Sequence, residues 1–331
     1  MKKRSGILFL ITLLVLSLLA ACGQKQEPVS GSAPESGEAV TEQETQEEAQ
    51  AETRVVEHVM GSTEITGTPE RVVVLYNGMV DIVLELGLQP VGAVQSWVGD
   101  PWYDYLEGKM DGVENLGEEG QPNLEAISAL KPDLIIGSQL RDEAVYDQLS
   151  QIAPTVFSES VFDWKGNMTL AAEALNREAK AEQFLANWDT KVTELREALG
   201  EQLNSEVSIV RFDPDHARIY YTGYAGTILD EIGFSRPENQ RVDDWGVKLT
   251  SEESIPEMNG DVIFDITIDW SGDGAVYATK EKWTSNPLWQ NLDGVKNDQY
   301  HEVDAVVWNM AGGATTAIMM LDDLYEIFQV K

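Results

Sequence analysis

The amino-acid sequence predicts an α/β protein of two lobes, each with a mainly parallel central sheet flanked by helices, joined by one long helix. Two observations predict the lobes. Short apolar runs alternate with helix-like segments through both halves of the chain, and one helix-to-strand pattern occurs once in each half. A helical segment at residues 180–203 supplies the candidate connection. Alternating strands and helices favour a parallel sheet covered on both faces.

The individual elements follow from these runs and from the glycines and prolines that bound them. In the first half, the expected strands are residues 71–76, 90–95, 133–137 and 154–157, and the expected helices are 80–86, 122–130 and 142–150. In the second half, the expected strands are residues 207–212, 218–222, 261–267 and 300–303, and the expected helices are 226–232 and 315–328.

The repeated pattern links the two halves. Glu125-x-Ile127-x-x-Leu130-x-x-Asp133 in the first half has the same spacing as Glu253-x-Ile255-x-x-Met258-x-x-Asp261 in the second. One helix-to-strand unit used in each half indicates two lobes of related design, although chance matches between ordinary αβ units are common.

The segment between the halves carries apolar residues every three or four positions, as on one face of a helix. They are Phe184, Trp188, Val192, Leu195 and Leu199. A helix of about 24 residues spans roughly 36 Å, enough to bridge two lobes, but the spacing equally fits a helix packed inside one lobe. We therefore expect lobes at 54–167 and 204–331, with a linker region at 168–203.

The start of the chain has the features of an export signal. Lys2, Lys3 and Arg4 precede a short apolar run that ends in Leu19-Ala20-Ala21-Cys22, and that run is too short to span a bilayer comfortably. The ending resembles the lipobox of bacterial lipoproteins, so we expect a signal peptide at 1–21 and a lipid on Cys22, the chain's one cysteine. Residues 22–53 are rich in Gly, Ser, Glu, Gln and Pro and predict a flexible tether.

The charge restricts the possible partners. The formal net charge is −34, which argues against nucleic acid and against close contact with anionic lipid. We expect a monomer on the extracytoplasmic face of the cell membrane, held there by the lipid on Cys22.

Several segments together resemble the iron-siderophore group of periplasmic-type binding proteins that serve ABC importers. They are residues 123–136, 141–156, 210–212, 233–237 and 307–313. The resemblance implies two α/β lobes joined by one long helix, a ferric siderophore as ligand, and an ABC permease with its ATPase as partners. Haem, cobalamin and a bare metal ion are alternative ligands for the same architecture.

Ligands of open α/β sheets bind beyond the carboxyl ends of strands, and the expected strand ends here carry aromatic and arginine side chains. Rings offer flat contact area, and guanidinium groups donate to metal-bound oxygens. The candidate ligand-binding residues are Asn77, Trp97, Arg141, Arg211, Tyr221, Tyr224, Trp245, Trp270, Trp308 and Asn309. Arg141 also matches an arginine that the resembled family uses against ligand oxygens.

The resemblance gives Glu125 and Glu253 a role as well. In the family, one acidic residue per lobe docks onto basic residues of the importer, and these two occupy matched positions. Stabilisation of a helix N-terminus by a carboxylate explains them equally well.

Other classes of function lack support in the sequence. The three histidines, His58, His216 and His301, have no metal-ligand spacing, so we expect neither a cofactor nor a protein-bound metal, the iron being carried within the ligand. A lipid-anchored α/β hydrolase is the alternative class, but no Gly-x-Ser-x-Gly or phosphate-loop motif occurs. Because residues 304–309 contain no arginine, the sequence favours hydroxamate or mixed citrate-hydroxamate chelates over purely carboxylate or catecholate ones.

Overall fold

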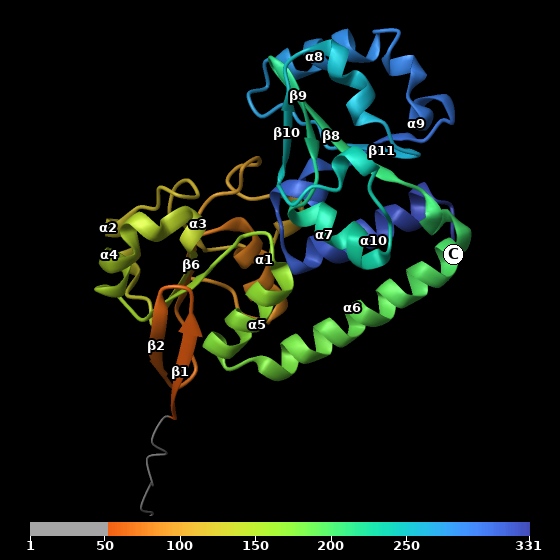
Figure 1. The fold of residues 1–331 in the computed structure, drawn as a ribbon. Coiled ribbons are helices and arrows are strands. Elements are labelled where there is room, and N and C mark those ends of the chain that lie inside the picture. Colours follow the sequence, from red (N-terminus) through yellow and green to blue (C-terminus); the bar gives the residue numbers. More distant parts are fainter. Residues whose placement is uncertain (1–51) are drawn as a thin grey trace, which may run out of the picture. The chain divides into compact units, whose positions relative to one another are not determined.

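The computed structural model describes residues 52–331, which form two five-stranded sheets and a separate two-stranded hairpin (Figure 1). The predicted signal peptide, Cys22 and the predicted tether up to residue 51 lie outside the described residues. The hairpin, which the sequence did not predict, consists of β1 (Thr53–His58) and β2 (Gly61–Thr66), so β1 begins at the last residue of the predicted tether. No helix in residues 52–331 combines the length and apolar character needed to cross a membrane.

The sheet of the first lobe is entirely parallel, in the order β5-β4-β3-β6-β7. Every residue of β3 and β6 is buried, as expected where helices cover both faces. The strands are β3 (Val72–Val74), β4 (Gly92–Ala93), β5 (Glu114–Asn115), β6 (Leu134–Ser138) and β7 (Thr155–Ser158). The helices are α1 (Asn77–Glu85), α2 (Leu124–Leu130), α3 (Gln139–Asp142), α4 (Tyr146–Ser150) and α5 (Trp164–Leu175), with 3-10 turns at Asp104–Leu106 and Glu143–Val145.

The sheet of the second lobe is mixed, in the order β10-β9-β8-β11-β12. β8, β11 and β12 are parallel, whereas β9 pairs antiparallel with both β8 and β10. The strands are β8 (Val207–Asp213), β9 (His216–Tyr220), β10 (Gly246–Leu249), β11 (Val262–Asp265) and β12 (Tyr300–Glu302). The α-helices are α7 (Gly223–Ile232), α8 (Ala275–Thr284), α9 (Asp293–Lys296) and α10 (Ala314–Ile327). The other helical elements are 3-10 helices at Gly200–Asn204, Glu238–Gln240, Glu252–Met258 and Trp289–Asn291, and a π-helix at Val306–Met310.

The two-lobe α/β fold predicted from the sequence is confirmed, and the repeated pattern has a structural counterpart in both lobes. Ile127 and Ile255 are fully buried under their sheets. Asp133 accepts hydrogen bonds from the backbone N–H groups of Glu70 and Arg71 just before β3, and Asp261 accepts one from Glu206 just before β8. The carboxylates at the corresponding position of the two repeats, Asp133 and Asp261, therefore each fix the start of a central strand in their own lobe.

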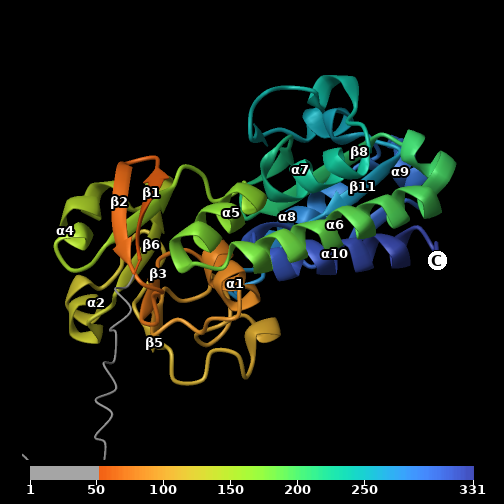
Figure 2. The same cartoon turned by 90° about the horizontal axis from the view of Figure 1, so that it is seen from below.

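A long helix, α6 (Glu178–Leu199), runs between the lobes, and α10 packs beside it (Figures 1 and 2). Trp188, Val192 and Leu195 on α6 are buried, as their spacing predicted. They belong to one apolar cluster that includes Val74 of β3, Phe264 of β11 and residues of α10. Each sheet also has a separate apolar cluster on its other face. The lobes therefore share a continuous core beneath the space between them.

The start of α10 is held by the first lobe. Asp81 of α1 is fully buried and accepts hydrogen bonds from the backbone N–H groups of Thr315 and Thr316. Burial raises the pKa of Asp81 to about 6, although these hydrogen bonds favour the ionised form. A Cβ on Gly78 would lie 2.6 Å from the carbonyl oxygen of Gly312, so only glycine permits this close approach of α1 to the loop before α10.

Candidate functional site

A cleft of about 470 Å³ lies between the lobes, at the carboxyl ends of central strands of both sheets. The first lobe contributes residues that follow β3, β4, β5, β6 and β7. The second lobe contributes residues of β8, β9, the π-helix Val306–Met310 and three loops. The lining residues are Tyr76, Asn77, Gly78, Trp97, Glu119, Arg141, Val161, Phe162, Arg211, Arg218, Tyr220, Trp245, Trp270, Asn309, Met310, Ala311 and Gly312. The position agrees with the rule that ligands of open α/β sheets bind beyond strand ends.

The polar part of the first lobe is organised by Glu119. Its side chain is only 4% exposed, and one of its oxygens accepts a hydrogen bond of 2.7 Å from Nε of Arg141. The other oxygen accepts from the backbone N–H and the side-chain amide of Asn77, at 3.0 and 2.8 Å. Glu119 therefore fixes Arg141 and the start of α1 together, while the remaining donors of the guanidinium stay free of this carboxylate.

The turn that carries Arg141 is itself anchored from within. Asp142 is buried and accepts a hydrogen bond from the backbone N–H of Ser138 at the end of β6. Burial raises the pKa of Asp142 to about 7. This interaction fixes the short helix α3 against the strand and directs the preceding side chain, Arg141, toward the cleft.

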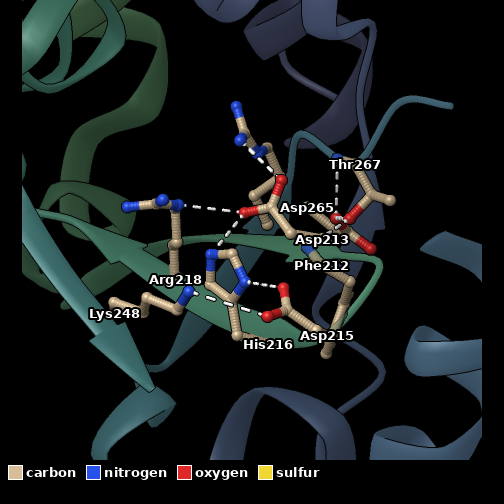
Figure 3. A network of polar contacts seen from close by, with 9 residues as sticks. Phe212, Asp213, Asp215, His216, Arg218, Lys248, Asp265 and Thr267 are labelled. Carbon is tan, nitrogen blue, oxygen red and sulfur yellow. Dashed lines mark hydrogen bonds and ion pairs between the residues drawn. The ribbon is translucent and has the colours of Figure 1, made fainter. Parts of the chain in front are cut away.

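The second lobe presents two arginines from adjacent antiparallel strands. Arg211 on β8 and Arg218 on β9 are direct cross-strand partners. Asp213 binds both: its Oδ1 accepts from Nη2 of Arg211 at 2.6 Å, and its Oδ2 accepts from Nε of Arg218 at 2.9 Å (Figure 3). Alternation along β8 places Val210 and Phe212 in the core on the opposite face, so the arginines face away from that core.

Aromatic rings pack against all three guanidinium groups. The guanidinium carbon of Arg141 lies 5.9 Å from the ring centroid of Trp97, and that of Arg211 lies 5.5 Å from Trp270. Arg218 lies 5.1 Å from the ring of Trp245. Such cation–π contacts contribute about 0.5–1 kcal/mol at exposed sites. Trp97 and Trp270 come from different lobes and meet edge to face, with centroids 6.1 Å apart.

Seven of the ten ligand-binding candidates line this cleft: Asn77, Trp97, Arg141, Arg211, Trp245, Trp270 and Asn309. The other three do not. Tyr221 follows Tyr220 in the chain, so its side chain points to the opposite face and packs against the outer core of the second sheet. Tyr224 is buried and its hydroxyl donates to the carbonyl oxygen of Gly313. Trp308 is fully buried and donates to Asp323 at 2.7 Å.

Three cleft residues with polar side chains escaped the sequence reasoning. Arg218 and Tyr220 lie two positions apart in an expected strand, so their side chains should point to the same face of the sheet. The sequence did not reveal, however, that this strand pairs with β8. Glu119 lies in an irregular, glycine-flanked segment between β5 and α2. A buried acidic residue in such a segment has no sequence signal.

The cleft is chemically distinct from the strongly acidic chain around it. Arg141, Arg211 and Arg218 meet only the carboxylates Glu119 and Asp213 as ion-pair partners among residues 52–331. The five groups together carry a net positive charge, and tryptophan rings surround them. This combination suits a ligand that has exposed anionic oxygens and flat or apolar flanks.

Glu125 and Glu253 lie outside the cleft. Both are exposed, Glu125 in the first turn of α2 and Glu253 in the first turn of the 3-10 helix Glu252–Met258. In the described part of the chain, neither carboxylate forms an ion pair, whereas the neighbouring Glu252 pairs with Lys282. Residues 52–331 also contain no group of three or more His, Cys, Asp or Glu side chains that could hold a metal ion.

Two α/β lobes, one connecting helix and a cleft between opposed strand ends define a bilobal solute-binding protein. Residues 72–306 match the family described as periplasmic binding protein, and the chain belongs to this family. The family resemblance seen in the sequence is thereby confirmed.

Three relatives place the chain more closely. It is 44% identical to the probable siderophore-binding lipoprotein YfiY of Bacillus subtilis (strain 168), with 99% of each chain covered. It is 37% identical to the achromobactin-binding periplasmic protein of Dickeya dadantii (strain 3937), over 78% of this chain and 86% of that one. The crystal structure of Staphylococcus aureus SirA complexed with staphyloferrin B superposes with a TM-score of 0.81 at 43% identity, covering 84% of this chain and 99% of SirA.

Proposed function

We propose that this protein captures a ferric siderophore in the inter-lobe cleft and delivers it to an ABC importer for iron uptake. The cleft carries three arginines and a rim of tryptophans at the point where the strand ends of both lobes meet. The relatives named above are siderophore- or achromobactin-binding proteins, and SirA was crystallised with staphyloferrin B. We infer a binding protein and not an enzyme, with iron carried inside its ligand.

We further propose that the preferred chelate presents carboxylate or similarly anionic oxygens. The sequence favoured hydroxamate-containing chelates because residues 304–309 contain no arginine. That argument loses its basis once the cleft is assembled, since Arg141, Arg211 and Arg218 reach it from α3, β8 and β9. Each charge-assisted hydrogen bond to an anionic oxygen contributes roughly 1.5–3 kcal/mol. Three guanidinium groups therefore favour an anionic chelate over a neutral one of similar size.

Two further assignments complete the proposal. A lipid on Cys22 would hold the protein at the outer face of the cell membrane, consistent with the lipoprotein name of YfiY. Glu125 and Glu253, exposed at matched positions of the two lobes, would dock onto basic residues of the permease.

The test is a tryptophan-fluorescence titration of the purified protein with ferric staphyloferrin B, ferric achromobactin, ferric citrate, an uncharged ferric hydroxamate, haem and cobalamin. Trp97, Trp245 and Trp270 line the cleft, so a bound ferric chelate should quench their emission strongly. We expect saturable quenching by one or more of the anionic chelates and at least tenfold weaker binding of the neutral hydroxamate. Tightest binding of haem, cobalamin or the hydroxamate would refute the proposed ligand class.

A further inference from the structure

Two like charges stand directly opposite each other at the cleft face of the second sheet. In the register of β8 and β9, Arg211 pairs with Arg218, and the next pair on the same face is Asp213 with His216. Directly opposed like charges destabilise an antiparallel pair. The arginines therefore need a nearby anion, and the adjacent pair supplies Asp213.

Asp213 is placed to hold both arginines at once. It is 7% exposed, and each of its oxygens accepts a hydrogen bond from a different guanidinium, Oδ1 from Nη2 of Arg211 and Oδ2 from Nε of Arg218. A ring nitrogen of His216 lies 3.0 Å from Oδ2 as well. Each guanidinium gives Asp213 a single nitrogen, so most of its five N–H donors are left for other acceptors.

The surroundings hold Asp213 in turn. His216, the first residue of β9, is set directly opposite Asp213 by the strand pairing. Asp215 lies in the β8–β9 turn, where it contacts the other ring nitrogen of His216 and lies 3.8 Å from Nζ of Lys248 on β10 (Figure 3). On the other side, the backbone N–H of Phe212 donates to Thr267, whose own N–H donates to Asp265. Strand pairing, the two arginines and His216 thus limit the movement of this carboxylate.

We propose that Asp213 is a positioning residue for anion recognition, which orders Arg211 and Arg218 into one two-guanidinium unit before the ligand arrives. The inference rests on the proposed function and extends it to a residue that does not line the cleft. Arginine side chains lose rotamer freedom when they are fixed in place. A site that is ordered in advance no longer loses this freedom on binding.

Charge alone predicts the opposite effect, and this makes the idea testable. A carboxylate near an anionic ligand repels it, so removing the negative charge should strengthen binding if electrostatics dominates. Removal should weaken binding if Asp213 acts by fixing the arginines. Asp215 offers a matched control because it lies two residues away, carries the same charge, and contacts His216 and Lys248 but neither cleft arginine.

The experiment compares Asp213→Asn with Asp215→Asn by calorimetric titration with ferric citrate and ferric staphyloferrin B, with thermal unfolding as a check on the fold. We expect Asp213→Asn to weaken binding at least tenfold, Asp213→Glu to recover part of the loss, and Asp215→Asn to change it less than threefold. Equal or tighter binding by Asp213→Asn overturns the proposal, as does a parallel loss in Asp215→Asn.

A ligand-free measurement separates this inference from the proposed function. The Nε–H of Arg218 donates to Asp213, so its NMR signal should be slow to exchange with water in the unmodified protein and fast in Asp213→Asn. If no anionic chelate binds the unmodified protein, the proposed function fails while this signal still decides the positioning role. An Arg218 signal equally protected in both proteins overturns the positioning role, whichever ligand binds.

Discussion

Trp97 of the first lobe and Trp270 of the second meet edge to face across the mouth of the cleft, with ring centroids 6.1 Å apart. Each ring also packs on an arginine of its own lobe, Trp97 on Arg141 and Trp270 on Arg211. The four side chains form a continuous row from one lobe to the other. The row connects the two halves of the binding site without a backbone link.

The first prediction concerns this tryptophan pair. Trp97→Ala and Trp270→Ala should each weaken binding of the preferred ferric chelate, and a double-mutant cycle on the dissociation constants should show coupling. An aromatic pair contributes about 0.5–1.5 kcal/mol beyond its buried area. Trp245→Ala is the control for coupling. Trp245 packs on Tyr220 and Arg218 of its own lobe, so Trp245→Ala and Trp97→Ala should have additive effects. Strictly additive effects of Trp97 and Trp270 would show that the pair does not act as a unit.

The second prediction concerns Arg141. Arg141→Ala should weaken an anionic chelate by roughly tenfold or more, which is the expected loss of one charge-assisted hydrogen bond. Arg141→Lys should restore little, because an ammonium group lacks the planar fork that reaches Glu119 and a ligand together. Arg196→Ala removes an exposed arginine from α6 and should leave affinity unchanged. Titration calorimetry of the three variants provides the measurement, and full affinity in Arg141→Ala would exclude a direct contact.

The third prediction concerns the pH dependence of stability. Burial raises the pKa of Asp81 to about 6 from a reference value of 3.8. Its contribution to stability is therefore fully present below about pH 4 and is lost as the pH rises through about 6. A shift of this size corresponds to at most about 3 kcal/mol. Asp81→Asn carries no titrating proton there, so its stability relative to the unmodified protein should increase across this window.

Urea unfolding between pH 4 and pH 8 measures that difference. Asp147→Asn, at an exposed position of α4, controls for the loss of one negative charge. If Asp81→Asn and the unmodified protein keep a constant difference in unfolding free energy over the range, Asp81 does not change its protonation state there and the prediction is wrong.

The fourth prediction concerns delivery to the importer. Reversing both exposed carboxylates, Glu125→Arg with Glu253→Arg, should abolish siderophore-dependent iron uptake in a strain lacking the original gene. Chelate affinity should stay the same, because neither residue lines the cleft. Glu182→Arg with Glu281→Arg reverses two other exposed carboxylates and should leave uptake intact. Normal uptake by the first pair would leave both glutamates with only a stabilising role at helix starts.

The sequence predicted the fold more completely than the site, for physical reasons. Buried strands such as β3 and β6 are continuous apolar runs, and α6 shows its apolar face at regular spacing. Such patterns are local. Residues 164–175 form α5, which was not predicted separately because three of its seven buried positions are alanine and one is asparagine, so its buried face contrasts little with its exposed face.

Site residues depend on pairings that the local sequence does not reveal. Arg211 was identified because a charge within an apolar strand is costly without a partner, whereas Arg218 required knowledge that β9 folds back on β8. Trp308 and Tyr224 were grouped with the ligand-facing rings, and the structure buries both, because composition alone does not distinguish a ring with a buried hydrogen-bond partner from one facing a cleft. Asp323 and Gly313, their partners, lie 15 and 89 residues away in the chain.

The anchoring of α10 on α1 has a consequence for assembly. The final helix of the second lobe begins on a carboxylate of the first, and its apolar side chains fill the core that both lobes share. Strands β3 to β7 can pair before α10 is in place, but the opposing walls of the cleft acquire their mutual spacing only when residues 314–327 have packed. A chain that ends before that helix would retain most of its sheet structure but would not form a functional ligand-binding cleft.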